Sequence, residues 1–73
     1  MLQKLRFIIC KYVDVKPEEI AYETDIREMG LTSFDVMNIV AECEVEFNVV
    51  IAERDIRTLL SIGDLAFYIN RAK

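Results

Sequence analysis

The segment from Ser33 to Phe47 constrains the fold more than any other part of the chain, because its apolar residues follow a helical period. Placed on a helix at about 100° per residue, they form two apolar stripes, whereas a surface helix of a small bundle needs only one. One stripe consists of Val36, Ile39, Val40, Cys43 and Phe47, and the other of Phe34, Met37, Ala41 and Val45. Either the helix is central and both stripes are core, or one stripe is core and the other contacts a partner.

The rest of the chain also predicts helices, and no stretch of it favours a strand. We predict helices at 2–13, 33–47, 53–59 and 61–71 from apolar residues at helical spacing. Thr32 with Asp35, and Ser61 with Asp64, have the spacing of capping boxes, which mark two of the helix starts. Pro17 interrupts the helical pattern, so that a long connection is expected before Gly30.

These elements predict an all-α fold in a single domain spanning residues 1–73. We expect a small antiparallel four-helix bundle with three longer helices, one short helix and a long first connecting loop. The expected core consists of Leu5, Ile9, Tyr12, Ile26, Ile39, Val40, Phe47, Ile51, Leu59, Ile62, Leu65 and Ile69.

The residue types present exclude most catalytic and metal-binding chemistry, so no enzyme activity and no metal site are expected. The chain has no histidine, the commonest general base and metal ligand. Its two cysteines, Cys10 and Cys43, lack the spacing of a zinc site and stand among apolar residues, where buried thiols behave as small hydrophobes. Two glycines are too few for a P-loop or a GxGxxG motif.

The charge distribution predicts the class of partner. The net charge is −4, and between Arg27 and Arg54 no basic residue interrupts six acidic ones. Such a negative field repels nucleic acid and anionic membranes, and it favours a basic protein partner, unless these acids merely form a solvated helix face. The N-terminal residues do not resemble a signal peptide, and no stretch is long enough to span a membrane. We therefore expect a cytoplasmic, monomeric protein without membrane insertion.

Taken together, the stretches "TDIREMGLTSF", "AECEVEF", "VVI" and "LAFYI" resemble the acyl carrier protein family in order and spacing, from Leu2 to Ile69. The resemblance implies that a phosphopantetheinyl transferase attaches 4′-phosphopantetheine from coenzyme A to Ser33. The thiol of that arm would carry acyl groups as thioesters between acyl-transferring and chain-elongating enzymes of fatty acid or polyketide-type biosynthesis. The carrier itself would catalyse nothing. The exposed end of a helix suits such a group, because its partial positive charge favours a phosphodiester.

Two groups of residues are expected to serve this function. The partner-binding surface is expected to comprise Phe34, Met37, Ala41, Glu44 and Val45, and the acyl pocket to comprise Val40, Cys43, Phe47, Ile56, Leu59 and Ile62. Cys43 is smaller than the leucine of many relatives, so that it would leave room for an acyl chain deep in the bundle.

The chain departs from the family pattern beside the serine. Thr32 stands where the family usually has aspartate, and Phe34 where it has leucine. The missing acid removes one contact with the transferase, which leaves a helical interaction module without modification as one alternative. A peptidyl or D-alanyl carrier of the same fold is another, because the partner enzymes choose the cargo.

Overall fold

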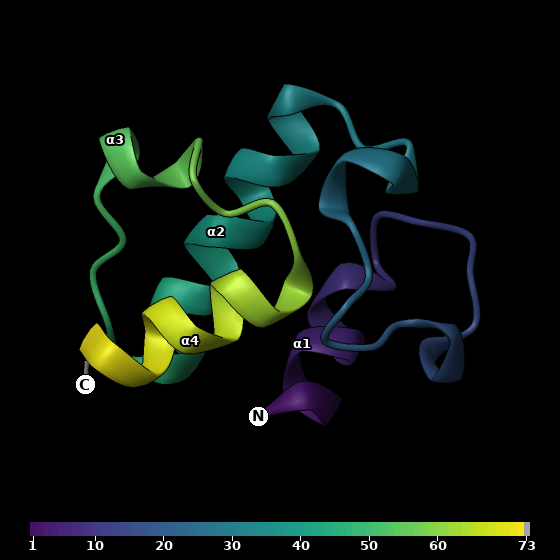
Figure 1. Ribbon diagram of the computed structural model, residues 1–73, viewed down its shortest axis with the longest axis horizontal. Helices are drawn as coiled ribbons and strands as arrows, with labels where there is room; N and C mark the ends of the chain where they lie inside the picture. Colours follow the sequence, from purple (N-terminus) through teal and green to yellow (C-terminus); the bar gives the residue numbers. More distant parts are fainter. Residues whose placement is uncertain (73) are drawn as a thin grey trace.

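The computed structural model describes residues 1–72, which form four α-helices and two short 3₁₀ helices (Figure 1). The elements are α1 (Leu2–Ile9), η1 (Pro17–Glu19), η2 (Ile26–Met29), α2 (Ser33–Phe47), α3 (Glu53–Ile56) and α4 (Ile62–Ala72). Within residues 1–72 the β-type pairing is confined to an isolated antiparallel bridge between Asp25 and Ser61. The predicted all-α fold of four helices is therefore confirmed. No helix in this part of the chain is long and apolar enough to cross a membrane.

Helix α1 ends at Ile9, four residues before the predicted end at Val13. The Cys10 N–H still donates to the carbonyl four residues back, but the Lys11 and Tyr12 N–H groups donate to carbonyls only three residues back, at 3.2 and 2.9 Å. The last turn thus tightens into a 3₁₀ pattern. A 3₁₀ helix has about 3.0 residues per turn and an α-helix about 3.6, so that apolar residues over a single turn have nearly the same spacing in both. The periodicity of the sequence therefore does not distinguish a 3₁₀ turn from an α-helical one here.

Helix α3 is also shorter than predicted, ending at Ile56 and not at Leu59. The Thr58 hydroxyl donates to the Asp55 carbonyl at 2.7 Å, and the Thr58 N–H donates to the same oxygen at 3.0 Å. A threonine side chain that bonds to a nearby carbonyl competes with the regular helical ladder, which here gives way to a turn. Helix α4 lies within one residue of its predicted bounds.

Helix α2 begins and ends as its sequence predicts. The Thr32 hydroxyl accepts from the Asp35 N–H at 3.0 Å, and the Asp35 carboxylate accepts from the Thr32 N–H at 3.1 Å, which completes the capping box. At the other end Asn48 adopts a left-handed conformation (φ 54°), which asparagine tolerates better than most residues. Gly30, with φ 76°, supplies the left-handed turn between η2 and the start of α2.

The long connection is fastened to the start of α4 by three backbone hydrogen bonds, which we call the loop clasp. These are Ile26 N–H to Leu60 O at 2.9 Å, Ile62 N–H to Thr24 O at 3.0 Å and Gly63 N–H to Tyr22 O at 2.7 Å. A Cβ atom at Gly63 would lie 3.0 Å from the Tyr22 carbonyl oxygen, so that any other residue here would require this tight contact to widen.

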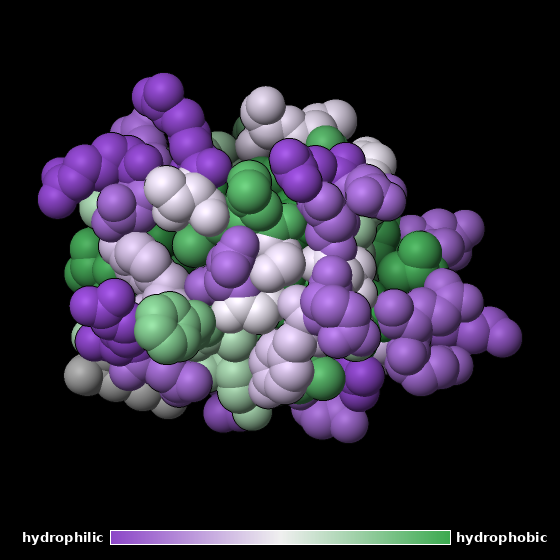
Figure 2. Space-filling model, viewed as in Figure 1, coloured by the Kyte–Doolittle hydropathy of each residue, from purple (hydrophilic) through white to green (hydrophobic). Residues whose placement is uncertain are grey.

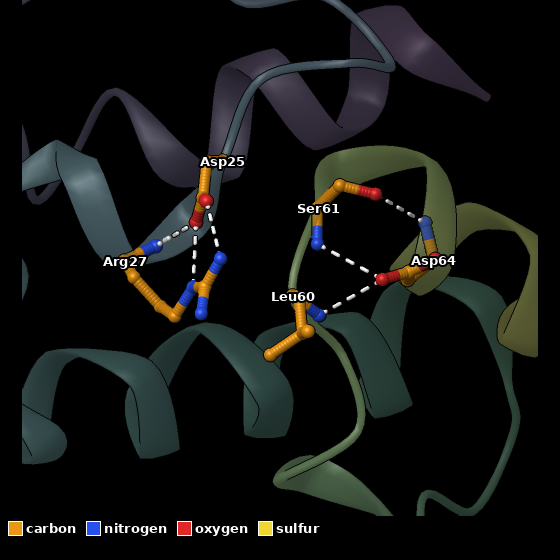
Figure 3. Close-up of polar contacts among 5 residues, drawn as sticks. All are labelled: Asp25, Arg27, Leu60, Ser61 and Asp64. Carbon is orange, nitrogen blue, oxygen red and sulfur yellow. Dashed lines mark hydrogen bonds and ion pairs between the residues drawn. The ribbon is translucent and has the colours of Figure 1, made fainter.

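Side chains reinforce both sides of this junction (Figure 3). The Asp64 carboxylate accepts from the N–H groups of Leu60 and Ser61 at 3.0 and 3.1 Å, and the Ser61 hydroxyl accepts from the Asp64 N–H at 3.1 Å. This confirms the second capping box. Across the junction, Asp25 binds the backbone N–H and the guanidinium of Arg27 at 2.7–3.0 Å. The connection is therefore an ordered part of the fold.

The core lies where α1, α2 and α4 meet the long connection. Nine of the twelve predicted core residues are buried, but Tyr12, Ile26 and Leu59 are only partly buried because they lie at the rim. Five further residues complete the buried set, which are Ile8, Ile20, Cys43, Val49 and Ala66. Ile20 belongs to the connection, and its carbonyl accepts from the Arg6 guanidinium at 2.8 Å.

Candidate functional site

Ser33 is the first residue of α2 and its side chain is exposed. The preceding residue, Thr32, caps the helix, so that the Ser33 hydroxyl is not used for capping and makes no hydrogen bond to any residue within 1–72. The first N–H groups of a helix lack partners within the helix, and together they favour a negatively charged group. The start of α2 therefore offers an accessible hydroxyl beside backbone donors that suit a phosphate ester.

The two apolar stripes of α2 face different environments. Ile39, Val40, Cys43 and Phe47 are buried in the core and Val36 is partly buried. On the other stripe, which we call the outer stripe, Phe34, Met37 and Val45 are 74%, 46% and 85% exposed, and Ala41 is also exposed. The outer stripe thus leaves a continuous apolar surface that begins next to Ser33 and follows α2 to its last turn. Exposed apolar residues in a row are typical of contact surfaces.

Two of the acidic side chains of α2 are paired with residues of α1 or of the turn that follows it. Glu42 binds the Lys11 ammonium at 2.6 Å and accepts a hydrogen bond from the Tyr12 hydroxyl. These two contacts lower the pKa of the Glu42 carboxyl, and the bond to Glu42 raises the pKa of Tyr12. Glu46 lies 3.4 Å from the Lys4 ammonium. Both carboxylates thus lie against bases of the same chain, on the side of α2 that packs near α1.

The other two acidic side chains of α2 bind backbone N–H groups. Asp35 belongs to the capping box, and Glu44 accepts from the Ile51 N–H at 2.9 Å. Glu44 was expected to contact partners together with the outer stripe, but its half-buried carboxylate fixes the segment that follows α2. Helical periodicity predicts the faces of α2 on which these four acids lie. It does not show that each of them contacts a base or a backbone N–H group of the same chain.

A small apolar cavity lies between α2, α4 and the long connection, near the end of α2 that bears Ser33. Its volume is about 20 Å³, and it is lined by Ile9, Ile26, Met29, Leu31, Val36, Ile39, Val40, Ile56, Leu59 and Leu65. The structure brings three of the six expected pocket residues to it, which are Val40, Ile56 and Leu59. The contribution of Ile26, Met29 and Leu31 was missed, because the sequence does not show that the connection folds over this end of α2.

Cys43, Phe47 and Ile62 do not line this cavity, contrary to the expected acyl pocket. They are packed in the core, where Cys43 and Ile62 are fully buried. Burial, aided by neighbouring carboxylates, raises the pKa of the Cys43 thiol to about 12. Cys43 is thus the core thiol that its apolar neighbours predict, whereas Cys10 is only partly buried. Within residues 1–72 no three His, Cys, Asp or Glu side chains gather as a metal site would require.

A larger surface groove, of about 490 Å³, lies between the outer stripe and α3. It is lined by Met37, Glu53, Arg54, Ile56 and Arg57. Arg54 and Arg57 are exposed and form no ion pair with any residue within 1–72. Figure 2 shows strongly hydrophilic side chains gathered at the position of α3, at the upper left. These arginines are not evident as site residues in the sequence, because nothing in it indicates that α3 lies beside Met37.

Comparison with known proteins gives consistent matches over almost the whole chain. Residues 3–69 match the family described as "Phosphopantetheine attachment site". The acyl carrier protein of Wolinella succinogenes is 27% identical over 70 residues, which cover 94% of this chain and 92% of that protein. The structure of the acyl carrier protein from Enterococcus faecalis is similar with a TM-score of 0.85 at 27% identity, covering 99% of this chain and 92% of that one. A chain in the structure of the ishigamide ketosynthase/chain length factor shares the fold, with a TM-score of 0.77, 21% identity and coverage of 97% and 90%.

Proposed function

The chain belongs to the phosphopantetheine attachment site family, as a carrier domain of the acyl carrier protein type, and we propose that its attachment residue is Ser33. Members of this family hold 4′-phosphopantetheine covalently and are carriers, not catalysts. The observation that carries the proposal is the exposed hydroxyl at the start of α2, which Thr32 leaves free by capping the helix. The arm supplies a thiol that holds acyl groups as thioesters.

The residues of this chain have three tasks in the attachment. Gly30 turns the backbone so that Ser33 reaches the surface, and the N-terminal N–H groups of α2 compensate the negative charge of a phosphodiester. The capping box keeps that helix end ordered without occupying the serine.

Attachment is tested by incubating the unmodified chain with coenzyme A, magnesium and a phosphopantetheinyl transferase. Intact mass spectrometry should show the gain of one phosphopantetheinyl group, and peptide mapping should locate it on Ser33. Ser33→Ala should remain unmodified, whereas Ser61→Ala, which alters the serine of the other capping box, should be modified normally. Modification at another residue, or none with several transferases, would overturn the proposal.

The outer stripe is proposed as the surface that contacts the transferase and the acyl-handling enzymes. An apolar centre of this kind is the usual anatomy of a protein interface, in which a few well-placed side chains dominate the affinity. Met37→Glu should leave the melting temperature nearly unchanged but slow the modification of Ser33 sharply. Val50→Glu is the matched control, because Val50 is 80% exposed and lies beyond the end of α2. Unfolding of the Met37 variant would instead assign Met37 a role in the core.

The cargo is proposed to be an acyl chain of fatty acid or polyketide-type biosynthesis. The chain enters at the end of the bundle that contains the small cavity and is sheltered there from water. A cavity of about 20 Å³ holds no more than a water molecule, so that an acyl chain enters only as the lining side chains move. Met29 and Leu59 are only partly buried, and methionine adapts readily to a new shape. Each buried CH₂ group contributes about 0.8 kcal/mol, which favours entry of longer chains.

This shelter is tested by the melting temperatures of forms loaded with acyl chains of increasing length. Binding that favours the folded state raises the melting temperature, so that it should rise with chain length. Val40→Phe should abolish the rise by filling the cavity, whereas Cys43→Ser, away from the cavity, should lower all melting temperatures by a similar amount. Melting temperatures independent of length would favour a peptidyl or D-alanyl cargo held outside the bundle.

A further inference from the structure

We propose that Tyr68 determines how long an acyl chain must be to enter the bundle, because its hydroxyl holds α3 in place over the small cavity. This inference rests on the proposed shelter of an acyl cargo. The cavity of about 20 Å³ must widen before a chain can enter, so that one of its sides has to move. The side that is most weakly held moves first, and the contacts that hold it set the cost of entry.

Most of the cavity wall belongs to firmly held parts of the fold. The helices α1, α2 and α4 contribute buried core residues to it, which are Ile9, Ile39, Val40 and Leu65. The long connection contributes residues from the range 26–31, and the loop clasp fastens that connection to α4. The remaining side comes from residues 52–59, which we call the α3 segment. Its lining residues, Ile56 and Leu59, are only partly buried.

One side chain supplies the hydrogen bonds that hold the α3 segment. Within residues 1–72, the hydrogen bonds from this segment to other parts of the chain are the two made by the Tyr68 hydroxyl of α4. That hydroxyl donates to the Asp55 carboxylate at 2.6 Å and accepts from the Ala52 N–H at 3.2 Å. We call this pair of bonds the tyrosine latch. In Figure 1, α3 lies at the upper left, between two irregular connecting segments.

Movement of the α3 segment to widen the cavity breaks the tyrosine latch. Asp55 directly precedes the cavity-lining Ile56 in α3, so that the two residues move together. A hydrogen bond is lost once its atoms separate beyond the normal range, and a bond to a carboxylate is stronger than a neutral one. Its net loss is similar in size to the gain from burying about two CH₂ groups. The latch therefore raises the minimum length of a chain that enters.

The experiment compares melting temperatures of the unloaded chain and of forms that carry acyl chains of increasing length on Ser33. The chains are joined to the arm through an amide, which does not hydrolyse during heating. Tyr68→Phe removes the latch and keeps the ring. It should lower the melting temperature of the unloaded form, in which the latch is closed, by roughly 6–12 °C. With a long chain inside, the latch is already open, so that the same substitution should lower the melting temperature by less than about half as much.

The chain length gives a second readout of the same variant. The shortest chain that raises the melting temperature above that of the unloaded form should be shorter in Tyr68→Phe than in wild type, by about two CH₂ groups. Tyr22→Phe is the matched control, because the Tyr22 side chain is exposed, does not line the cavity and makes no hydrogen bond through its hydroxyl within residues 1–72. It should leave the minimum chain length unchanged.

Asp55→Ala removes the acceptor of the latch and tests the inference if Tyr68→Phe does not fold. It should also destabilise the unloaded form more than the loaded one. The combined variant should lose less stability than the sum of the two single variants, because both remove the same bond. An equal fall in the melting temperatures of all forms of Tyr68→Phe or Asp55→Ala, with an unchanged minimum length, would overturn this inference alone. Wild-type melting temperatures independent of chain length would overturn the proposed shelter, and this inference with it.

Discussion

Replacement of Thr32 by valine should destabilise α2 by a predictable amount. Valine keeps the shape of threonine but lacks the hydroxyl that accepts from the Asp35 N–H at 3.0 Å. Loss of such a cap costs about 1 kcal/mol, within a range of about 0.5–2 kcal/mol. In a domain of this size, 1 kcal/mol corresponds to a fall of roughly 4–8 °C in melting temperature. Thermal unfolding followed by far-ultraviolet circular dichroism measures this directly.

Thr32→Asp is the companion variant, because aspartate caps a helix as well as threonine and also places a negative charge at the positive end of α2. The neighbouring Asp35 carboxylate offsets part of that gain, so that the melting temperature should stay close to wild type. Any change in the modification rate of this variant then reports contact with the transferase and not helix stability. If Thr32→Val melts like wild type, or if Thr32→Asp is destabilised equally, the capping argument is wrong.

Three further perturbations test other parts of the structure. Gly30→Ala should lower the free energy of unfolding by about 1–2 kcal/mol, because alanine is strained at φ 76°. Gly30→Asn should lower it less, since asparagine tolerates this conformation better. Urea denaturation measures both, and equal losses would contradict the strain argument. Iodoacetamide at pH 8 should alkylate Cys10 before Cys43 in the unmodified native chain, since Cys43 is buried with a pKa of about 12. Peptide mass spectrometry measures the order of alkylation, and earlier alkylation of Cys43 would contradict its burial in the core. Glu42 has a pKa lowered by its contacts with Lys11 and Tyr12, so that its stabilising effect is present above the ordinary carboxyl pKa and is lost as the pH falls through the lowered one. Acid unfolding of Glu42→Gln should therefore depend less on pH than that of wild type, and identical pH dependences would show that these contacts do not stabilise the fold.

The parts of the fold that depend on local sequence could be predicted, and those that depend on distant pairing could not. Helix α2 and its capping box follow from residues within four positions of one another. Glu42 and Lys11, by contrast, are 31 residues apart, and only the packing of α1 on α2 brings them together. For the same reason the sequence shows the acidic run but not which groups of the chain its carboxylates on α2 contact.

The candidate site shows the same division. Ser33 is identified by the sequence around it, and its exposure depends on the adjacent cap. The position of the cavity depends on where the long connection folds, and hence on contacts such as those of Met29 and Leu31 with the core. Expecting Cys43 to line the cavity assumed that a small side chain leaves space, whereas the neighbouring side chains pack tightly around it.

The loop clasp also affects the order of events during protein synthesis. Its groups at Leu60, Ile62 and Gly63 are synthesised after their partners at Ile26, Thr24 and Tyr22, which precede them in the chain. The segment that leads into Ser33 therefore has no partner for these backbone groups until α4 emerges from the ribosome. We expect the nascent chain to acquire its ordered attachment site only after α4 has emerged, and the transferase to act on chains in which the loop clasp has formed.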